Sequence, residues 1–426
     1  MTERLLQFIW KMQYFNSSNL ETTDRDSLYI LYPGIWNSHQ GPDFKDARIR
    51  LNQTPWAGNI ELHLKSSHWN LHKHSEDWNY DNIILHVVWE NDMTIFNVSG
   101  NPIPTLELQD KVSKLLLEKY EELMKSKMSV PCAGMLLQVE GLTWTSWKER
   151  LLIERLIHKS GQIENHLMEC NNHWEEVFWW TIAKNFGMHQ NSESFEAIAR
   201  SIPLKILIKH KKQIHQLEAF LLGQAGLLEK NFEDKYAELL RKEYQFLKEK
   251  YQLHEIQGPI HFLRMRPGNF PSIRLAQLAM LIHQSSHLFA KIRESDSLQD
   301  VKDLFSVTAN DYWHYRYTMD EPSPYKPKTL GKQMVDSLII NTIVPVLFAY
   351  GNLNNCDLEK QRALQWLQAT GPETNTITDE WKRIGVHVQN ASDSQALLEL
   401  FHSYCEKKKC LDCAIGNAML RITLTN

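Results

Sequence analysis

The apolar pattern of this 426-residue chain changes from an alternating to a helical period near Val130 and Pro131. Before that point, short segments alternate apolar and polar residues, as β-strands with one buried face do. After it, apolar residues recur almost only at intervals of three and four, which is the spacing of amphipathic helices. The chain is also longer than one hydrophobic core usually fills. The sequence therefore predicts a mixed α/β domain over residues 1–130 and a large all-α domain over residues 131–426.

The first domain is expected to contain one helix followed by strands in a defined order. Apolar residues at helical spacing follow Thr2, a residue type that often caps helices. Strand patterns come next in "SLYILY", "ARIRLN", "GNIELHLKSS" and "NIILHVVWE", and the polar, aromatic "NLHKHSEDWNY" between the last two most simply forms a short helix. The predicted order is helix, three strands, helix, strand.

Composition and charge limit the partners and the compartment. Hydrophobic residues at 42% and charged residues at 23% are ordinary globular values, and a net charge of -4 gives no general attraction to nucleic acid. The N-terminus has no signal-peptide pattern, and the apolar stretch from Leu338 to Tyr350 is interrupted and too short to span a bilayer. We expect a cytoplasmic protein with no membrane partner, whose binding of nucleic acid would need a local basic surface.

A polar row interrupts the third predicted strand. Glu61, His63 and Lys65 stand at every second position, so they share one face of the strand. A Pro-Asp pair, Pro42 and Asp43, precedes the second predicted strand. The row is either solvated or part of a site.

The element order, Pro42-Asp43 and the Glu-x-His pattern at Glu61 together resemble the PD-(D/E)XK nuclease superfamily. The resemblance covers the first domain and implies a restriction-endonuclease-like αβββαβ core with a mixed sheet, which hydrolyses phosphodiester bonds of DNA or RNA. His63 stands where the superfamily has a lysine, and Lys65 follows two residues later. The whole chain also resembles a bacterial family of unknown function, in "GPDF", "GNIELH", "LHVVWE" and its terminal cysteine cluster, but that likeness supplies no chemistry.

The expected chemistry of this site depends on a divalent cation. Phosphodiester hydrolysis needs a cation that neutralises the phosphate oxygens and lowers the pKa of an attacking water. The carboxylates of Asp43 and Glu61, with the carbonyl of Leu62, offer the oxygen ligands that Mg²⁺ or Mn²⁺ prefers. His63 and Lys65 would orient the water and stabilise the developing charge.

Other residues are candidates for a supporting role. Glu76 and Tyr80 are four apart, and the superfamily often has a Gln-x-x-x-Tyr pair here, so Tyr80 is expected to contact substrate. Glu3 is a candidate extra carboxylate. Arg264, Arg266 and Arg274 surround a Pro-Gly turn before a helix and could hold phosphates, although arginines in such a loop can equally pair with nearby acids.

Two alternatives remain open. A histidine-rich zinc hydrolase could use the imidazoles of "HLKSSHWNLHKH" with Asp77 or Asp43, the imidazoles being those of His63, His68, His72 and His74. Against it, His72 and His74 are two apart and would point to different sides of a helix. The other alternative is a catalytically inactive nucleic-acid-binding or scaffold protein on the same fold.

Three of the six cysteines lie close together near the C-terminus. Cys405, Cys410 and Cys413 have the spacing C-x4-C-x2-C, which suits zinc or an iron–sulfur cluster in a structural role. His402 or Cys356 could be the fourth ligand. Reduced, buried thiols are the alternative, and Cys132 and Cys170 are expected to be isolated core thiols.

Overall fold

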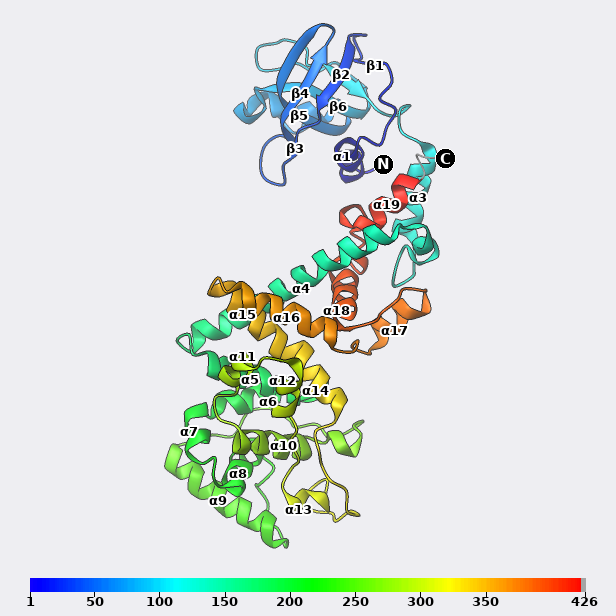
Figure 1. The fold of residues 1–426 in the computed structure, drawn as a ribbon. Helices are drawn as coiled ribbons and strands as arrows, with labels where there is room; N and C mark the ends of the chain where they lie inside the picture. The colour runs from blue at the N-terminus through cyan, green and yellow to red at the C-terminus, as the bar shows by residue number, and fades with distance from the viewer. Residues whose placement is uncertain (423–426) are drawn as a thin grey trace. The chain divides into compact units, whose positions relative to one another are not determined.

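A computed structural model describes residues 1–422 of the chain. The chain forms two compact units, of which the first comprises Met1–Trp147 and Leu400–Asn426 and the second comprises Lys148–Glu399. The first holds a mixed sheet, the second is helical, and the predicted fold class is confirmed (Figure 1). The division differs from the boundary expected at residue 130, because residues 131–147 and the C-terminal cysteine segment group with the sheet.

The sheet of the first unit has seven strands in the order β1-β2-β4-β5-β6-β7, with β3 paired to β4. Strands β2, β4 and β5 are antiparallel neighbours, whereas β6 joins β5 and β7 joins β6 in parallel. All four predicted strand segments form. The strands are β1 (Leu20–Glu21), β2 (Ser27–Tyr32), β3 (Ile35–Trp36), β4 (Phe44–Leu51), β5 (Thr54–Lys65), β6 (Ile83–Glu90) and β7 (Thr105–Glu107).

Helix α1 (Glu3–Met12) begins where the sequence places its cap. The hydroxyl of Thr2 accepts the N–H of Leu5 at 3.2 Å, and Gln13 ends the helix in the left-handed conformation. The buried stripe of α1 includes Leu6 and Ile9, and the helix contacts β5. The predicted first helix is therefore present and belongs to the core of the sheet.

The connection from β5 to β6 is not the single short helix expected. It consists of α2 (His68–Leu71), the 3-10 turns η1 (His74–Glu76) and η2 (Trp78–Tyr80), and the residues that join them. Lys73 has φ 58°, so α2 cannot continue through it. Trp69 anchors the connection by packing with Ile95 and Ile103.

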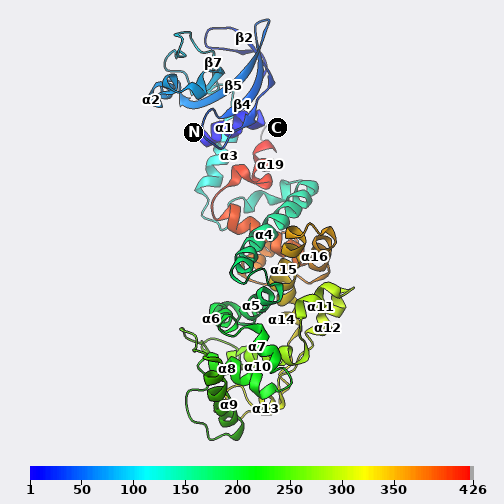
Figure 2. The same ribbon diagram turned by 90° about the vertical axis from the view of Figure 1, so that its left-hand side faces the viewer.

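The C-terminal segment returns to the first unit. Tyr14 donates a hydrogen bond to Asn417 at 2.7 Å, and Arg4 pairs with Asp412. The remaining helical elements here are α3 (Lys114–Lys125), η3 (Ala133–Gln138), the start of α4 (Gly141–Glu169), the π-helical η6 (Phe401–Cys405), η7 (Cys410–Asp412) and α19 (Ala414–Ile422). Figure 2 shows α19 beside α3, which it contacts.

The second unit is built from helices around an apolar core. They are α5 (Trp174–Phe186), α6 (Met188–Ser201), α7 (Leu204–Lys209), α8 (Ile214–Gln224), α9 (Lys235–Tyr251), η4 (Pro267–Asn269), α10 (Pro271–Gln284), α11 (Leu288–Glu294), α12 (Leu298–Leu304), α13 (Asp311–His314), α14 (Lys332–Leu338), η5 (Ile339–Ile343), α15 (Val344–Leu353), α16 (Asp357–Ala369), α17 (Thr376–Arg383) and α18 (Ala391–Leu400).

One helical run of this unit is longer than the sequence pattern suggested. Within the described residues, Lys332–Leu353 is long and apolar enough to cross a bilayer, and Asn341 and Pro345 do not interrupt it. However, 78% of its most apolar window is buried inside the structure. A core helix of a globular unit has the same length and composition.

Candidate functional site

Asp43 and Glu61 meet where β4 begins beside β5. The backbone N–H of Asp43 donates to Glu61 Oε2 at 3.0 Å, and the N–H of Leu62 donates to Asp43 Oδ2 at 3.1 Å. The other Asp43 oxygen accepts a hydrogen bond from Gln7 of α1 at 2.7 Å. The two predicted acids are thus held side by side by the backbone of adjacent strands and by the first helix.

Three imidazoles gather next to this pair. The ring nitrogens of His63, His72 and His74 offer ligand atoms that all lie within 4.8 Å of one another. His63 lies on β5 and is completely buried, His74 is 9% exposed, and His72 is exposed to solvent. The group is therefore anchored in the sheet and open to solvent at one side.

The backbone of the connection explains how His72 and His74 reach the same place. The expectation that they point to different sides of a helix is wrong, because α2 ends at Leu71. The left-handed Lys73 between them turns the chain, so both rings face His63, at centroid distances of 5.0 Å and 5.2 Å. The objection to a histidine metal site is removed.

The three imidazoles of His63, His72 and His74, which we call the histidine trio, lie beside the carboxylate of Glu61. Glu61 Oε1 lies 3.5 Å from His74 Nε2 and 3.8 Å from His63 Nε2, and His63 Nε2 lies 3.1 Å from His72 Nδ1. The buried Nε2 of His74 has no hydrogen-bond partner. A tetrahedral ion with bonds of 2.0–2.1 Å needs donor atoms about 3.3 Å apart, so these separations suit one cation.

His86 is a neighbour that the sequence reading missed. It is completely buried on β6, in register with Glu61, and its Nε2 lies 2.8 Å from His63 Nδ1. If His63 Nδ1–H donates to His86, the lone pair of His63 Nε2 faces the other imidazoles. The sequence shows His86 as a histidine within the strand segment "NIILHVVWE". Only the parallel register of β5 and β6 shows that it lies beside Glu61 and His63.

The electrostatics of the acids favour a cation. Burial raises the pKa of Asp43 above its ordinary value, and the carboxylate of Glu3 adds to this. Burial also raises the pKa of Glu61, and the negative charge of Asp43 raises it further. Because the pair resists carrying two negative charges in a dry environment, a divalent cation would relieve an existing repulsion.

The buried imidazoles of His63, His74 and His86 are in the protonation state that binds metals. Burial, with a smaller contribution from neighbouring imidazoles, lowers the pKa of His63 to about 2 and that of His74 to about 4. Burial likewise lowers the pKa of His86 to about 3. These rings are neutral at pH 7, and neutral imidazole is the form that binds metal ions.

The sheet face that carries the cluster continues beyond it. Arg48 and Arg50 pair in register with Ala57 and Pro55 of β5, which alternate onto the same face as Glu61. Tyr29 and Tyr32 of β2 stand opposite these arginines in register. The two arginines and two tyrosines are all exposed and form what we call the Arg-Tyr face.

The other candidates in the first unit have different surroundings. Lys65 is exposed, and its ammonium lies 3.3 Å from Glu90 Oε2 on β6, so it pairs with that acid. Glu76 is exposed on η1. Tyr80 stacks on the ring of His74 at 3.9 Å between centroids, so its ring positions a member of the trio.

The three predicted phosphate-binding arginines belong to the second unit. Arg264 and Arg266 are exposed, whereas Arg274 is only 6% exposed. Its guanidinium donates to Asn269 Oδ1 at 2.6 Å and to Gln277 Oε1 at 2.9 Å. Burial lowers the pKa of Arg274 to about 10. The Arg274 guanidinium is therefore buried and hydrogen bonded to side chains of its own unit.

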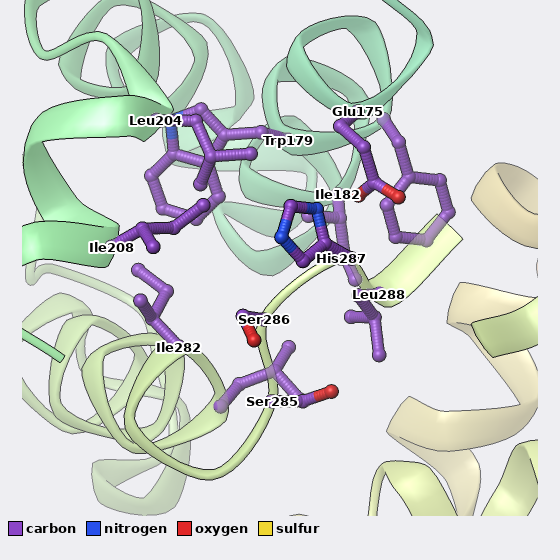
Figure 3. A pocket seen from close by; sticks show the side chains of 12 residues that line it. Glu175, Trp179, Ile182, Leu204, Ile208, Ile282, Ser285, Ser286, His287 and Leu288 are labelled. Carbon is purple, nitrogen blue, oxygen red and sulfur yellow. The ribbon is translucent and has the colours of Figure 1, made fainter. Parts of the chain in front are cut away.

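A pocket in the second unit offers little room for a ligand. Figure 3 shows Glu175 and His287 beside apolar side chains such as Trp179 and Ile182, and the cavity holds about 30 Å³. That volume suits roughly one water molecule. The Glu175 carboxylate already accepts the N–H groups of Phe289 and Ala290 at the start of α11. The cluster of histidines and carboxylates in the first unit is therefore the stronger candidate for a functional site.

Comparison with known proteins gives a family but no activity. No curated protein and no solved structure matches the chain. A family model described as "Protein of unknown function (DUF2851)" matches residues 3–376, so the chain belongs to the DUF2851 family.

Proposed function

We propose that this protein is a metal-dependent phosphodiesterase that cleaves nucleic acid at the cluster of Glu61, His63, His72 and His74. The observation that carries the proposal is the cluster of three imidazoles, two of which, those of His63 and His74, also face one oxygen of Glu61, beside the second carboxylate of Asp43. Such donor sets bind divalent metals in hydrolytic enzymes. The element order of the nuclease superfamily supports the same reaction class.

The donor atoms favour a transition metal over Mg²⁺. Mg²⁺ prefers oxygen ligands, whereas imidazole suits zinc, iron and other first-row metals. The cluster offers three imidazoles and one outward carboxylate oxygen, since both Asp43 oxygens already accept hydrogen bonds. We therefore infer that Mn²⁺ or Zn²⁺ is bound, with Glu61 and the trio as ligands. The Mg²⁺ expected from the carboxylates alone becomes the less suitable ion.

Each side chain then has a stated role. A cation held by Glu61 and the three imidazoles, with a further coordination position left for water, would neutralise phosphate oxygens and supply a water of lowered pKa. Asp43 lies beside Glu61, and its raised pKa suits it to accept a proton from that water. By accepting from His63 Nδ1–H, His86 would fix the tautomer of His63, and the exposed side of His72 would give substrate its approach.

The Arg-Tyr face supports a polynucleotide substrate. Guanidinium groups bind phosphates, and tyrosine rings stack on bases without regard to sequence. Arg50 already lies over the ring of Tyr29, 6.0 Å from its centroid. A single strand bound along this face would reach the cluster on the same side of the sheet. Arg48 and Arg50 would supply the local basic surface that the chain's overall charge does not provide.

Charge removal on the Arg-Tyr face is expected to weaken binding of a single strand. The double variant Arg48→Ala/Arg50→Ala should lower affinity for a single-stranded oligonucleotide about tenfold and flatten the salt dependence by roughly 0.7 per lost phosphate contact. Fluorescence anisotropy over a salt series measures both. Lys114→Ala, which removes an exposed lysine from α3, is the control. An unchanged salt slope in the double variant would remove the face from the proposal.

Metal titration combined with a cleavage assay tests the proposal as a whole. The chelator-treated full chain is titrated with Mn²⁺, Zn²⁺ and Mg²⁺ by calorimetry, then incubated with labelled single- and double-stranded DNA and RNA. We expect Mn²⁺ or Zn²⁺ to bind more tightly than Mg²⁺ and to support cleavage. His72→Ala should weaken binding by at least about tenfold, and His68→Ala, outside the trio, should not. Binding of metal without cleavage of any substrate rejects the phosphodiesterase, and nucleic-acid binding without metal indicates the scaffold alternative.

A further inference from the structure

Four cysteines lie together in the first unit, although one is far from the others in sequence. Cys132 directly precedes η3, Cys405 ends η6, Cys410 begins η7 and Cys413 directly precedes α19. All four are free thiols, and each is 6–8% exposed. Helix α19 contacts both η3 and η7, and η7 contacts η6. The expectation that Cys132 is an isolated core thiol is therefore wrong.

The backbone that follows the turn from Cys410 to Cys413 directs N–H groups toward the Cys413 sulfur. The N–H of Cys413 donates to Cys410 O at 3.4 Å, and the N–H groups of Ile415 and Gly416 donate to the Cys413 sulfur. A Cβ on Gly416 would lie only 2.3 Å from Cys410 O, so this tight turn needs a glycine. Amide donors aimed at a sulfur stabilise its thiolate form.

The cysteine sulfurs are close enough for the charge of one thiolate to shift the pKa of another. Burial raises the pKa of Cys132 to about 12, and Cys413 and Cys410 add to the shift. Burial also raises the pKa of Cys405, with contributions from the other three. Lys408 acts in the opposite direction on Cys410. These mutual effects place Cys132 near the three late cysteines.

The two candidate fourth ligands named from the sequence fit less well. Cys356 belongs to the second unit. His402 is half exposed, and its Nδ1 lies 2.9 Å from Glu406 Oε2. Cys132 is buried with the three late cysteines, so it is the fourth ligand that the structure offers.

We propose that Cys132, Cys405, Cys410 and Cys413 bind a structural metal centre as four thiolates. Binding releases the thiol protons to solvent. The centre would fasten the returning segment, from Leu400 to the end of α19, to the part of the first unit that precedes the second unit. Trp147, the last residue before the second unit, lies near the Cys413 sulfur, so the centre would lie beside the point where the chain leaves the first unit.

The spacing of the sulfurs bears on which metal is bound. A single zinc with bonds of about 2.3 Å needs sulfurs about 3.8 Å apart, whereas an iron–sulfur cluster binds each thiolate to a separate iron and needs a wider spacing. Among the described residues, the group whose ligand atoms all lie within 4.8 Å of one another is the histidine trio. Within the described residues, no three of the cysteine sulfurs meet that spacing, so an iron–sulfur cluster fits them better than a single zinc ion, and metal analysis distinguishes the two.

Metal analysis of the full chain, purified without chelator, tests the proposal. We expect stoichiometric zinc, or iron with sulfide and visible absorption, that is kept in His72→Ala and in Cys170→Ser. Cys132→Ser should lose most of this metal. Cys170 is the matched control because it is a free thiol outside the four. Unchanged metal in Cys132→Ser would overturn the proposal, as would a wild-type chain without zinc or iron at these thiols.

A second measurement covers the case in which Cys132→Ser does not fold. X-ray absorption at the metal edge of the His72→Ala protein reports the ligands of the remaining metal directly. A shell of four sulfurs at about 2.3 Å supports the proposal, and a shell of nitrogen and oxygen overturns it. Because this readout does not involve cleavage, it is independent of the proposed phosphodiesterase.

Discussion

Glu61→Gln is expected to lower metal-dependent cleavage by about 10³-fold at saturating substrate, equivalent to roughly 4 kcal/mol of transition-state stabilisation. Glutamine has the same size and can still accept the N–H of Asp43, so the strands keep their contact. The substitution removes the negative charge and replaces the oxygen that faces His63 and His74. Initial rates on a labelled oligonucleotide, measured over a Mn²⁺ series, give the effect.

Glu76→Gln is the matched control for this substitution. Glu76 lies on η1 in the adjoining connection, and its side chain is exposed. Its rate should stay within about twofold of the wild type, because exposed carboxylates outside a site contribute little. A Glu61→Gln rate within tenfold of the wild type at saturating Mn²⁺ would exclude Glu61 as a ligand.

Trp69→Ala is expected to destabilise the first unit by about 3–5 kcal/mol, in the range of buried Trp truncations. Trp69 is 1% exposed, and its indole N–H donates to Ser75 Oγ at 2.8 Å. Its ring packs edge-to-face against His74 and His86, at 5.2 Å and 5.5 Å between centroids. Loss of this support should also weaken Mn²⁺ binding by about 10–100-fold, as loss of outer-shell partners does.

Calorimetry of unfolding and Mn²⁺ titration measure the two effects of Trp69→Ala. The matched control is Trp78→Ala, because Trp78 lies in the same connection but is 79% exposed. Its unfolding free energy should change by no more than about 0.5 kcal/mol. If Trp69→Ala kept wild-type Mn²⁺ affinity while losing stability, Trp69 would support the fold without positioning the imidazoles.

The strands were predictable because their signals are local. Alternating residues and β-branched runs predicted β2, β4, β5 and β6, and the Thr2 cap predicted the start of α1. The meeting of Asp43 and Glu61 also followed from local order, because a short antiparallel connection brings successive strands together. These parts of the fold depend on residues that are near one another in the chain.

The histidine trio was not predictable in the same way. A helix through residues 70–80 would have separated His72 from His74, and a single left-handed residue, Lys73, decided otherwise. Lysine has no strong preference for that conformation, so no local pattern signals it. Lys65 shows the converse: its place in the alternating row suggested a site, but the parallel neighbour β6 supplies Glu90 as its partner.

By itself, the sequence determined the two classes of secondary structure, the order of the central strands and the pairing of Asp43 with Glu61. Only the tertiary structure decided that His86 supports His63, that the Arg-Tyr face continues from the cluster, and that Cys132 joins three cysteines beyond the second unit. The reason is physical. Alternation and capping act between neighbours in the chain, whereas parallel pairing and the return of a distant segment depend on packing across the whole unit.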